Sequence, residues 1–450
     1  MTLKHIVIAA VLGLLAACSS VEVQPGASPV AAVRTSVFAD AQALAREHAG
    51  LSGQARIDNA ERIDALLARL DNATLSRGAA DLPAGDPLYT FAGRALLNRG
   101  LPLPRAFDRG DWRFDAAGRP PADRDGYRPP MKVALLLPLS GGQAAAAAAV
   151  RDGFLAGYYG EQRRKPEVRF YDTASGAAAA YARAVDAGND FVVGPLGRDE
   201  VDAVFAAQAL PVPLLALNRG SRTPPPGSAG FSLSPEDEGI ASAEYLVERG
   251  ARRVLVIAGS EDSQRRAASA LGDRLRQRGA EVAGRIDYTV ETVLALAPDA
   301  RVDAVFLALK GTQARALAPQ LAAAGLGNTP RVATSQLVSG TGRSSDDVLL
   351  DGILFPTETW GVHGVAGLPS PASVAQRLDT AKGPAARLFA FGFDAWLVTA
   401  YLERLALSAN ADVAGATGRL SLDGVGNVLR RPSWSRFSGG VPVPLADGAR

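Results

Sequence analysis

Beyond Met131 the chain alternates short apolar runs with longer segments in which apolar residues recur at helical spacing. The runs are mostly apolar on both faces, as expected for buried parallel strands. Eight runs carry this pattern: Val133–Leu137, Val168–Tyr171, Phe191–Val193, Leu214–Leu217, Val254–Ala258, Val282–Ile286, Val302–Leu307 and Ile353–Phe355. The pattern predicts an α/β fold with parallel sheets flanked by helices.

Three segments of helical length separate the early runs: Ala144–Tyr159, Ala177–Ala187 and Asp199–Gln208. Right-handed crossovers between parallel strands would place these helices on both faces of the sheet. Eight strands are more than one small sheet needs. We therefore expect two lobes.

Residues 35–100 predict a short all-α segment ahead of the sheets. One helical stripe contains Val37, Ala41, Leu44 and His48. A second contains Ile57, Ala60, Ile63, Leu67 and Leu70. Pro87 can open a third helix that closes near Gly100. Three helices would make one and a half repeat-like helical hairpins, without a strict repeat consensus.

Residues 101–130 are expected to be a linker, because Pro, Arg, Asp and Gly interrupt every apolar period. Trp112 and Phe114 are its exceptions. They either dock the linker onto a domain or face a partner.

The N-terminus predicts a signal peptide over residues 1–17. Lys4 and His5 precede a dozen apolar residues, fewer than the roughly 20 needed to span a bilayer. Leu15-Ala16-Ala17-Cys18 resembles the bacterial lipobox, which implies cleavage before Cys18 and its acylation with fatty acids such as palmitate. The alternative is an ordinary signal peptide with a chance cysteine.

Cys18 is the single cysteine of the chain, so it has no disulfide partner. Residues 18–34 are expected to form a tether. Ser19 follows the cysteine in place of Asp, which by analogy with lipoproteins favours the outer membrane. We expect no later stretch to be long and apolar enough for a transmembrane helix.

Composition and charge narrow the possible functions. Hydrophobic residues make up 47% of the chain, enough for a large core. The 48 basic and 46 acidic residues nearly balance, which gives no electrostatic case for nucleic-acid binding. Motifs for catalysis are absent from the sequence: no lysine follows a serine by three residues, and there is no phosphate-binding Gly-Lys-Ser/Thr loop or Gly-x-Ser-x-Gly elbow.

The titratable residues also favour a chain that is not an enzyme and holds no metal or cofactor. His48 lies on an apolar stripe, which favours a packed histidine over a catalytic base, and His363 lies in a Gly-rich loop. Asp346-Asp347 is expected to be a solvated loop. Glu236-Asp237-Glu238 follows Ser234, which can N-cap a helix whose positive end favours acids. A metal site is the alternative for this acidic run.

Several segments resemble the type I periplasmic binding proteins of the leucine-binding kind. They are "VALLLPLSGGQAAAAAAVRDGFLAGYY", "VRFYDTASG", "DFVVGPLGRDEV", "PVPLLALNRG", "FSLSPEDEG", "FAFGFDAW" and "GATGRLSLDGVGNVLRR". The resemblance spans about residues 131–440. It implies a two-lobe domain over 131–445 with three hinge crossings. Lobe 1 would comprise 131–233 and 357–414, and lobe 2 would comprise 234–356 and 415–445.

A narrower resemblance combines the lipobox, the helical segment, "LLLPLSG", "VVGPL", "LALN", "LSPEDE", "FGFDAW" and "GATGRLSLD". Together they are similar to the LppC family of penicillin-binding-protein activators. That resemblance implies an outer-membrane lipoprotein, facing the periplasm, that activates a bifunctional class A penicillin-binding protein in peptidoglycan synthesis and cell-wall growth. The chain departs from the family in its short helical segment. The distance that the protein extends from the membrane would therefore depend on residues 20–34 and 101–130.

The fold also predicts an interlobe cleft at the carboxyl ends of the strands. Its candidate residues are Ser140, Gly141, Gly142, Asp172, Pro195, Asn218 and Arg219. An amino-acid cleft of this kind has a Ser after the Gly-Pro turn and an Ala-Thr pair after the fourth strand, both missing here. Arg219 either binds a carboxylate or closes the cleft with an internal ion pair. A lipid-anchored solute-binding protein for an amino-acid-like ligand is therefore the alternative function.

Trp360 lies in an insertion-like loop, 357–381, that is longer than a connector needs. An exposed Trp360 beside Arg219 would make a partner anchor, since Trp and Arg are enriched in interface hot spots. The equal alternative is that Trp360 packs under its own loop. Trp396 and Trp434 are expected in the core.

Overall fold

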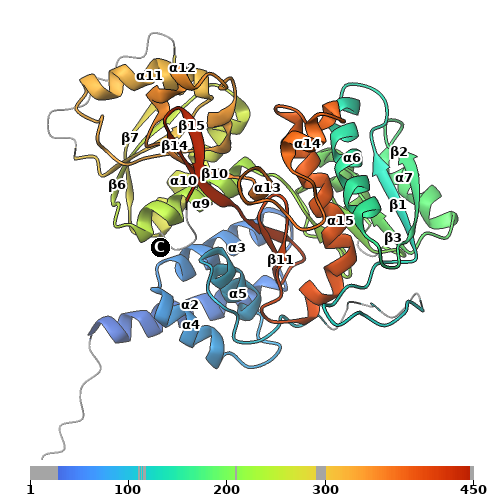
Figure 1. Ribbon diagram of the computed structural model, residues 1–450. Helices are drawn as coiled ribbons and strands as arrows, with labels where there is room; N and C mark the ends of the chain where they lie inside the picture. The colour runs from blue at the N-terminus through green and yellow to red at the C-terminus, as the bar shows by residue number, and fades with distance from the viewer. Residues whose placement is uncertain are drawn as a thin grey trace, which may run out of the picture.

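The computed structural model describes residues 29–109, 112, 114, 118–207, 210–289 and 301–445. The predicted signal peptide, Cys18 and most of the predicted tether lie outside these residues. The described chain forms a helical unit followed by two α/β lobes, as Figure 1 shows. The two-lobe α/β expectation is confirmed.

Four helices, not three, make up the N-terminal helical unit: α2 (Pro29–His48), α3 (Gly53–Ala68), α4 (Asn72–Asp81) and α5 (Leu88–Asn98). The hydrophobic pattern does not predict α4. This helix begins after Asp71, whose side chain accepts a hydrogen bond from the Thr74 amide at 2.8 Å. The tether prediction is wrong for residues 29–34, because they belong to α2.

The first lobe is built on a five-stranded parallel sheet in the order β2-β1-β3-β4-β5. Its strands are β1 (Lys132–Leu137), β2 (Glu167–Asp172), β3 (Phe191–Val193), β4 (Leu214–Ala216) and β5 (Ala229–Gly230). Its helices are α6 (Ala144–Gly160), α7 (Ala177–Asp186), α8 (Arg198–Phe205) and, from much later in the chain, α15 (Ala385–Leu407).

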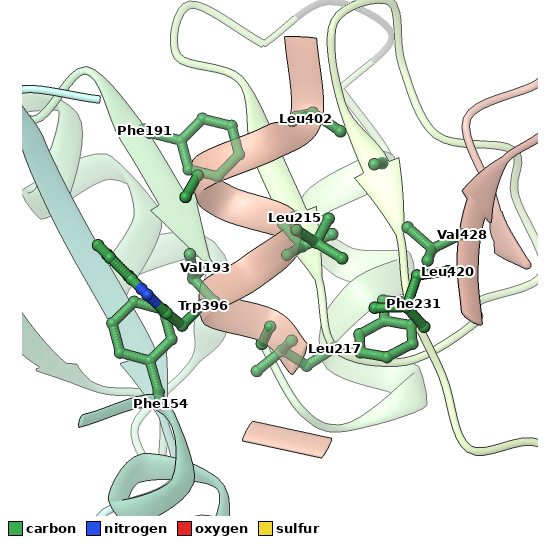
Figure 2. Packing of buried hydrophobic residues seen from close by; sticks show 14 of the residues in the cluster. Phe154, Phe191, Val193, Leu215, Leu217, Phe231, Trp396, Leu402, Leu420 and Val428 are labelled. Carbon is green, nitrogen blue, oxygen red and sulfur yellow. The ribbon is translucent and has the colours of Figure 1, made fainter. Parts of the chain in front are cut away.

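Helix α15 supplies the middle of the first core. In Figure 2 it carries Trp396 and Leu402 past the strand residues Phe191, Val193 and Leu215. It approaches α6 closely because both helices have a glycine at the crossing. A Cβ on Gly153 would lie 1.8 Å from the Phe389 carbonyl oxygen, and one on Gly392 would lie 1.9 Å from that of Val150.

By length and apolar composition α15 could cross a membrane, contrary to our expectation that no later stretch would. Two thirds of its most apolar window is buried inside the protein. Its hydrophobicity is therefore explained by its burial against the first sheet and α6.

The second lobe has a seven-stranded sheet in the order β15-β14-β10-β9-β8-β6-β7. Its strands are β6 (Arg253–Ala258), β7 (Glu281–Asp287), β8 (Ala304–Ala308), β9 (Arg331–Ala333), β10 (Leu354–Thr357), β14 (Ser433–Ser438) and β15 (Val441–Pro444). Its helices are α9 (Pro235–Glu248), α10 (Asp262–Gln277), α11 (Gly311–Ala323), η1 (Ser335–Val338), α12 (Ser344–Asp347) and η2 (Val348–Leu350). Strand β14, near the end of the chain, pairs with β10 in the antiparallel direction. The chain therefore returns to the second lobe after its passage through the first.

The loop over 357–381 packs on the first lobe, where the sequence placed it. It contains α13 (Thr359–His363), α14 (Pro371–Ala375) and η3 (Asp379–Ala381). Its buried residues join Phe389, Ala390 and Phe393 of α15 in one cluster.

The third crossing between the lobes lies later in the chain than the sequence predicts. Residues 415–431, which the prediction gives to lobe 2, form a small sheet on lobe 1 from β11 (Val413–Ala414), β12 (Arg419–Leu422) and β13 (Val428–Arg431). The buried carboxylate of Asp394 on α15 holds this sheet by accepting from the Ala416 and Thr417 amides. Only 433–444 joins the second sheet.

The described part of 101–130 is packed and does not behave as a free linker. Tyr127 is 3% exposed, and Arg128 makes a double hydrogen bond with Glu403 of α15 at 2.9 Å. Trp112 and Phe114 pack against the first core, which is the docking alternative. The described residues of this segment are therefore part of the packed protein and do not form a free spacer.

The helical unit contacts both lobes. The Arg278 guanidinium, just after α10 in lobe 2, donates to the Ala68 carbonyl at 3.2 Å. On the side of lobe 1, the Arg431 guanidinium of β13 donates to the Leu97 carbonyl of α5 at 3.4 Å. Figure 1 shows the unit lying across the base of both lobes.

Candidate functional site

The expected cleft residues at the ends of β1 and β2 serve their own loop. Ser140, Gly141 and Gly142 are exposed after β1. Asp172, at the end of β2, accepts hydrogen bonds from the amides of Leu139 and Ala174, both at 3.0 Å. These donors lower the pKa of Asp172 below its usual value. The carboxylate is therefore used to fix the loop.

The next two strands end in the remaining cleft candidates. Pro195 is buried after β3, in a cis peptide bond with Gly194. Asn218, after β4, donates from its side-chain amide to the Leu196 carbonyl at 2.8 Å. Arg219 forms an ion pair with Asp237 of α9 at 3.3 Å. Of the two alternatives for Arg219, the structure has the internal ion pair that joins lobe 1 to lobe 2.

Each carboxylate of the run Glu236-Asp237-Glu238 faces a different arginine. Glu236 binds Arg266 through two hydrogen bonds of 2.7 and 2.8 Å, Asp237 pairs with Arg219, and Glu238 pairs with Arg387. The run thus has a structural role rather than a metal-binding one. Ser234 does occupy the N-cap position, but its hydroxyl donates to Glu236 and caps no backbone amide.

Glu238 is the centre of a buried polar cluster, which we call the Glu238 network: Glu238, Ser335, Glu358, Arg387 and Arg430. Glu238 is 3% exposed and accepts from the Ser335 amide and hydroxyl, both at 2.9 Å. Arg387 donates to Glu238 and to the Ser335 hydroxyl, the latter at 2.7 Å, and lies 2.9 Å from Glu358. Arg430 lies 3.9 Å from Glu238.

The network joins the lobes where a parallel-sheet protein usually binds its ligand. Ser335 lies two residues beyond β9, at the carboxyl end of a lobe-2 strand, and Arg387 lies in the first turn of α15 in lobe 1. Burial alone would raise the pKa of Glu238, but the neighbouring guanidinium groups of Arg387 and Arg430 lower it below its usual value. The carboxylate is therefore charged and compensated at neutral pH.

The sequence pattern did not single out Arg387, Arg430 or Ser335. One signal was available: Arg387 is a charged residue just before the apolar run Leu388–Phe393. A charged residue on a helix of this kind needs a partner when it is buried. The partner itself lies 149 positions away, and no local pattern identifies it.

Trp360 is buried, so its interpretation as an exposed anchor is wrong. Its side chain is 3% exposed, stacks on Phe389 at a ring distance of 5.3 Å, and donates from Nε1 to the Pro369 carbonyl at 2.8 Å. It packs under its own loop, as the alternative held. Trp396 lies in the core, and half-buried Trp434 stacks on Tyr245.

The two described histidines, His48 and His363, lie in different parts of the protein. His48 hydrogen-bonds Asn59 at 3.2 Å and meets Phe91 edge-to-face, and burial lowers its pKa. His363 is exposed at the end of α13. Among the described residues, no three His, Cys, Asp or Glu side chains gather where they could hold a metal ion.

The prediction of a solvated loop at Asp346-Asp347 holds for one of the two residues. Asp346 is exposed, but Asp347 is 1% exposed, pairs with Arg315 and accepts from the Gly342 amide at 2.8 Å. The solvated-loop interpretation is therefore wrong for Asp347, which lies at the end of α12 and links it to α11 and to the Gly342 amide.

Both lobes match one protein family, described as "LppC putative lipoprotein", over residues 127–292 and 283–440. A penicillin-binding protein activator LpoA from Photobacterium profundum is 28% identical over 359 residues, covering 70% of this chain and 57% of the relative. The LpoA from Haemophilus influenzae is 26% identical over 328 residues, covering 70% of this chain and 55% of the relative. The chain thus spans somewhat more than half the length of these curated relatives.

Solved structures share the fold. The C-domain of Haemophilus influenzae LpoA, described as a regulator of PBP1A, has a TM-score of 0.61 at 24% identity and covers 70% of this chain and 100% of that one. Full-length LpoA from the same organism has a TM-score of 0.63 at 20% identity, covering 92% and 80%. A "putative branched-chain amino acid ABC transporter" from Chromobacterium violaceum has a TM-score of 0.55 at 27% identity, covering 68% and 100%. The binding-protein-like fold expected from the sequence is confirmed.

Proposed function

This chain belongs to the LppC lipoprotein family, and from that membership we propose that it binds and activates a bifunctional class A penicillin-binding protein. The observation that carries the proposal is the extent of the family match, which runs through both lobes. The curated relatives that match the same region are named penicillin-binding protein activators. The activity would be the stimulation of peptidoglycan cross-linking.

Activation in this proposal requires no chemistry from the chain itself. The sequence lacks the Ser-x-x-Lys nucleophile of the synthases, and the two histidines described above are used in packing or lie exposed. A non-catalytic protein can raise a partner's rate only if it binds the active conformation more tightly than the inactive one. The chain would supply a rigid surface with that preference.

The interlobe junction favours activation over solute binding. A solute-binding cleft needs polar groups that converge on the ligand. Here Arg219 pairs with Asp237, and Glu238 pairs with Arg387, so each lobe supplies the partner for the other. The similarity to a transporter-type structure shows the fold and does not favour carriage of a solute.

The proposed location is the periplasmic face of the outer membrane, with a lipid anchor at Cys18. The family is described as lipoproteins, and Leu15-Ala16-Ala17-Cys18 provides the acylation site. Two or more acyl chains give stable anchoring, since each buried CH2 contributes about 0.8 kcal/mol.

The stimulation itself is testable in solution. We expect the chain from Ser19 onward, which has neither the signal peptide nor the acylated cysteine and so needs no detergent, to raise the cross-linking rate of its cognate class A synthase by about fivefold or more, a size typical of coupling between two binding events. Cross-linked muropeptides from radiolabelled lipid II would be quantified, with serum albumin as the protein control. An unchanged rate at a concentration that saturates the synthase would disprove activation.

The anchor is testable in cells. The Cys18→Ala protein should be lost from the outer-membrane fraction, because without Cys18 the chain can be neither acylated nor cleaved at the lipobox. Membrane and periplasmic fractions would be compared by immunoblot, with Ser19→Ala as the neighbouring control that keeps the lipobox cysteine. Persistence of the Cys18→Ala protein in the outer membrane would contradict the lipid-anchor assignment.

A further inference from the structure

The chain crosses between the lobes three times, and the Glu238 network has a charged residue beside each crossing. The first crossing leads from β5 into α9, and Glu238 lies in the first turn of α9. The second follows β10, and Glu358 is the residue directly after that strand. The third leads from β13 to β14 through Pro432, and Arg430 lies two residues before that proline. The network therefore lies on the hinge between the lobes.

Arg387 links the charges at these crossings. It extends from the first turn of α15 in lobe 1, donates to Glu238 and lies 2.9 Å from Glu358. The side chains of Glu238 and Arg430 are only 3% and 4% exposed. Because little water reaches these two groups, a rotation of the lobes that separated the charges would be costly.

The groups around the Glu238 carboxylate have the chemistry of a site for a carboxylate ligand. Ser335 donates to it from its amide and its hydroxyl, both at 2.9 Å. Arg387 adds a charged donor. A backbone amide, a hydroxyl and a guanidinium group are typical of the polar groups that fix a ligand in its site. Here they converge on a side chain of the protein itself.

The position of these groups in the fold also agrees with a ligand site. Ser335 lies beyond the carboxyl end of β9, and ligands of open α/β sheets bind outside the carboxyl ends of the strands. Ser335 belongs to lobe 2 and Arg387 to lobe 1. A carboxylate that both of them bind favours the arrangement of the lobes in which they meet, as a bound solute would.

We propose that Glu238 is a built-in ligand: its carboxylate fills a carboxylate-binding site that Ser335, Arg387 and Arg430 form between the lobes. The protein thereby holds its lobes at one angle without a solute. A small monocarboxylate is the class of molecule that this site accepts when the Glu238 side chain is shortened. The inference is independent of the proposed action on a synthase, because it concerns the two lobes alone.

The first test restores the missing group from solution. Glu238→Ala keeps the Cβ atom and removes the CH2 and carboxylate groups, which together have the size of acetate. In the chain from Ser19 onward, about 100 mM sodium acetate should raise the melting temperature of the Glu238→Ala protein by about 2 °C or more over the same concentration of sodium chloride, because a ligand that binds only the folded protein stabilises it.

Glu236→Ala is the matched control for this rescue. It removes the same atoms from the same turn of α9, but from a pair with Arg266 in which both side chains are about a third exposed. Acetate should raise the melting temperature of neither this variant nor the unsubstituted protein. Equal effects of acetate and chloride on the Glu238→Ala protein would overturn the inference, and so would equal rescue of the two alanine variants.

A second measurement does not require the alanine variant to fold. Glu238→Gln keeps the size of the side chain and removes its charge. Spin labels on Ala179→Cys of α7 and Ala316→Cys of α11 would report the distance between the lobes, because both alanines are exposed and the chain from Ser19 onward has no cysteine of its own. We expect one narrow distance distribution for the protein with Glu238 and a wider one for Glu238→Gln. Identical distributions would refute the built-in ligand.

Discussion

The Glu238→Ala protein is expected to lose about 3–5 kcal/mol of unfolding free energy, because removal of one member of a buried ion pair leaves the other charge without compensation. Arg387 would remain beside Glu358, but it would lose the carboxylate on the second lobe. Ser335 would lose the acceptor of its amide and hydroxyl. The loss should fall on the junction between the lobes.

Urea unfolding at pH 7 measures this change, and the same helix supplies a matched control. Glu236 lies two residues earlier and pairs with Arg266, but both side chains are about a third exposed. Exposed pairs contribute about 0–1 kcal/mol, so Glu236→Ala should cost far less. Equal losses in the two variants would refute the importance we assign to the Glu238 network.

The Glu238 contribution also has a defined pH dependence. The pKa of Glu238 is lowered in the folded protein, so the unfolded chain binds its proton more readily. The stabilisation is therefore complete above the ordinary glutamate pKa and is lost as the pH falls through the lowered folded value. Glu238→Gln should remove this contribution to the loss of stability at acid pH. Above pH 6 the pH dependence of the unfolding free energy should come from the remaining titratable groups.

The Trp360→Ala protein should lose about 3–5 kcal/mol of unfolding free energy, the usual cost of deleting a buried aromatic side chain. Trp360 stacks on Phe389 and closes the cluster that fastens the 357–381 loop to α15. Thermal or urea unfolding would measure the loss. The loop should also become more sensitive to proteolysis, because its buried contacts are few.

Trp360→Phe is the conservative control. It keeps a ring against Phe389 but loses the Nε1 hydrogen bond to the Pro369 carbonyl, so we expect a loss of about 1–2 kcal/mol. A Trp360→Ala protein of unchanged stability that bound its synthase less tightly would instead restore the surface-anchor interpretation.

These two sites bear on how a binding-protein fold can serve an activator. The Glu238 network and the Arg219–Asp237 pair link the lobes, and the helical unit contacts both of them. A lobe arrangement fixed in this way presents one surface to a partner. Under the proposed function, that surface would be the part that prefers the active synthase.

Local patterns predicted the regular elements well. All eight apolar runs became strands, and Phe191–Val193 agrees at both ends with β3. The reason is that central parallel strands such as β1, β6 and β8 are apolar at nearly every position, which leaves a signal independent of the rest of the fold. The edge strands β2 and β7 are less buried and contain Arg169 and Arg285. Helix α4 was missed because its apolar stripe is short: Leu75 and Ala79 are its buried residues.

Errors arose where a segment's role depends on a distant neighbour. Residues 101–130 look like a linker in sequence, because their prolines remove every apolar period. They are nevertheless held by Glu403 and the first core. Residues 415–431 look like part of the final hairpin, but Asp394 on α15 holds them to the first lobe.

By itself, then, the sequence determined the order of strands and helices, the two-lobe α/β fold and a candidate acylation site at Cys18, because each follows from residues adjacent in the chain. The tertiary structure alone decided that Trp360 is buried and that Glu238 meets Arg387 across the lobes. The physical reason is distance along the chain. Hydrophobic periodicity records whether a position is covered, but it carries no information about which remote side chain covers it.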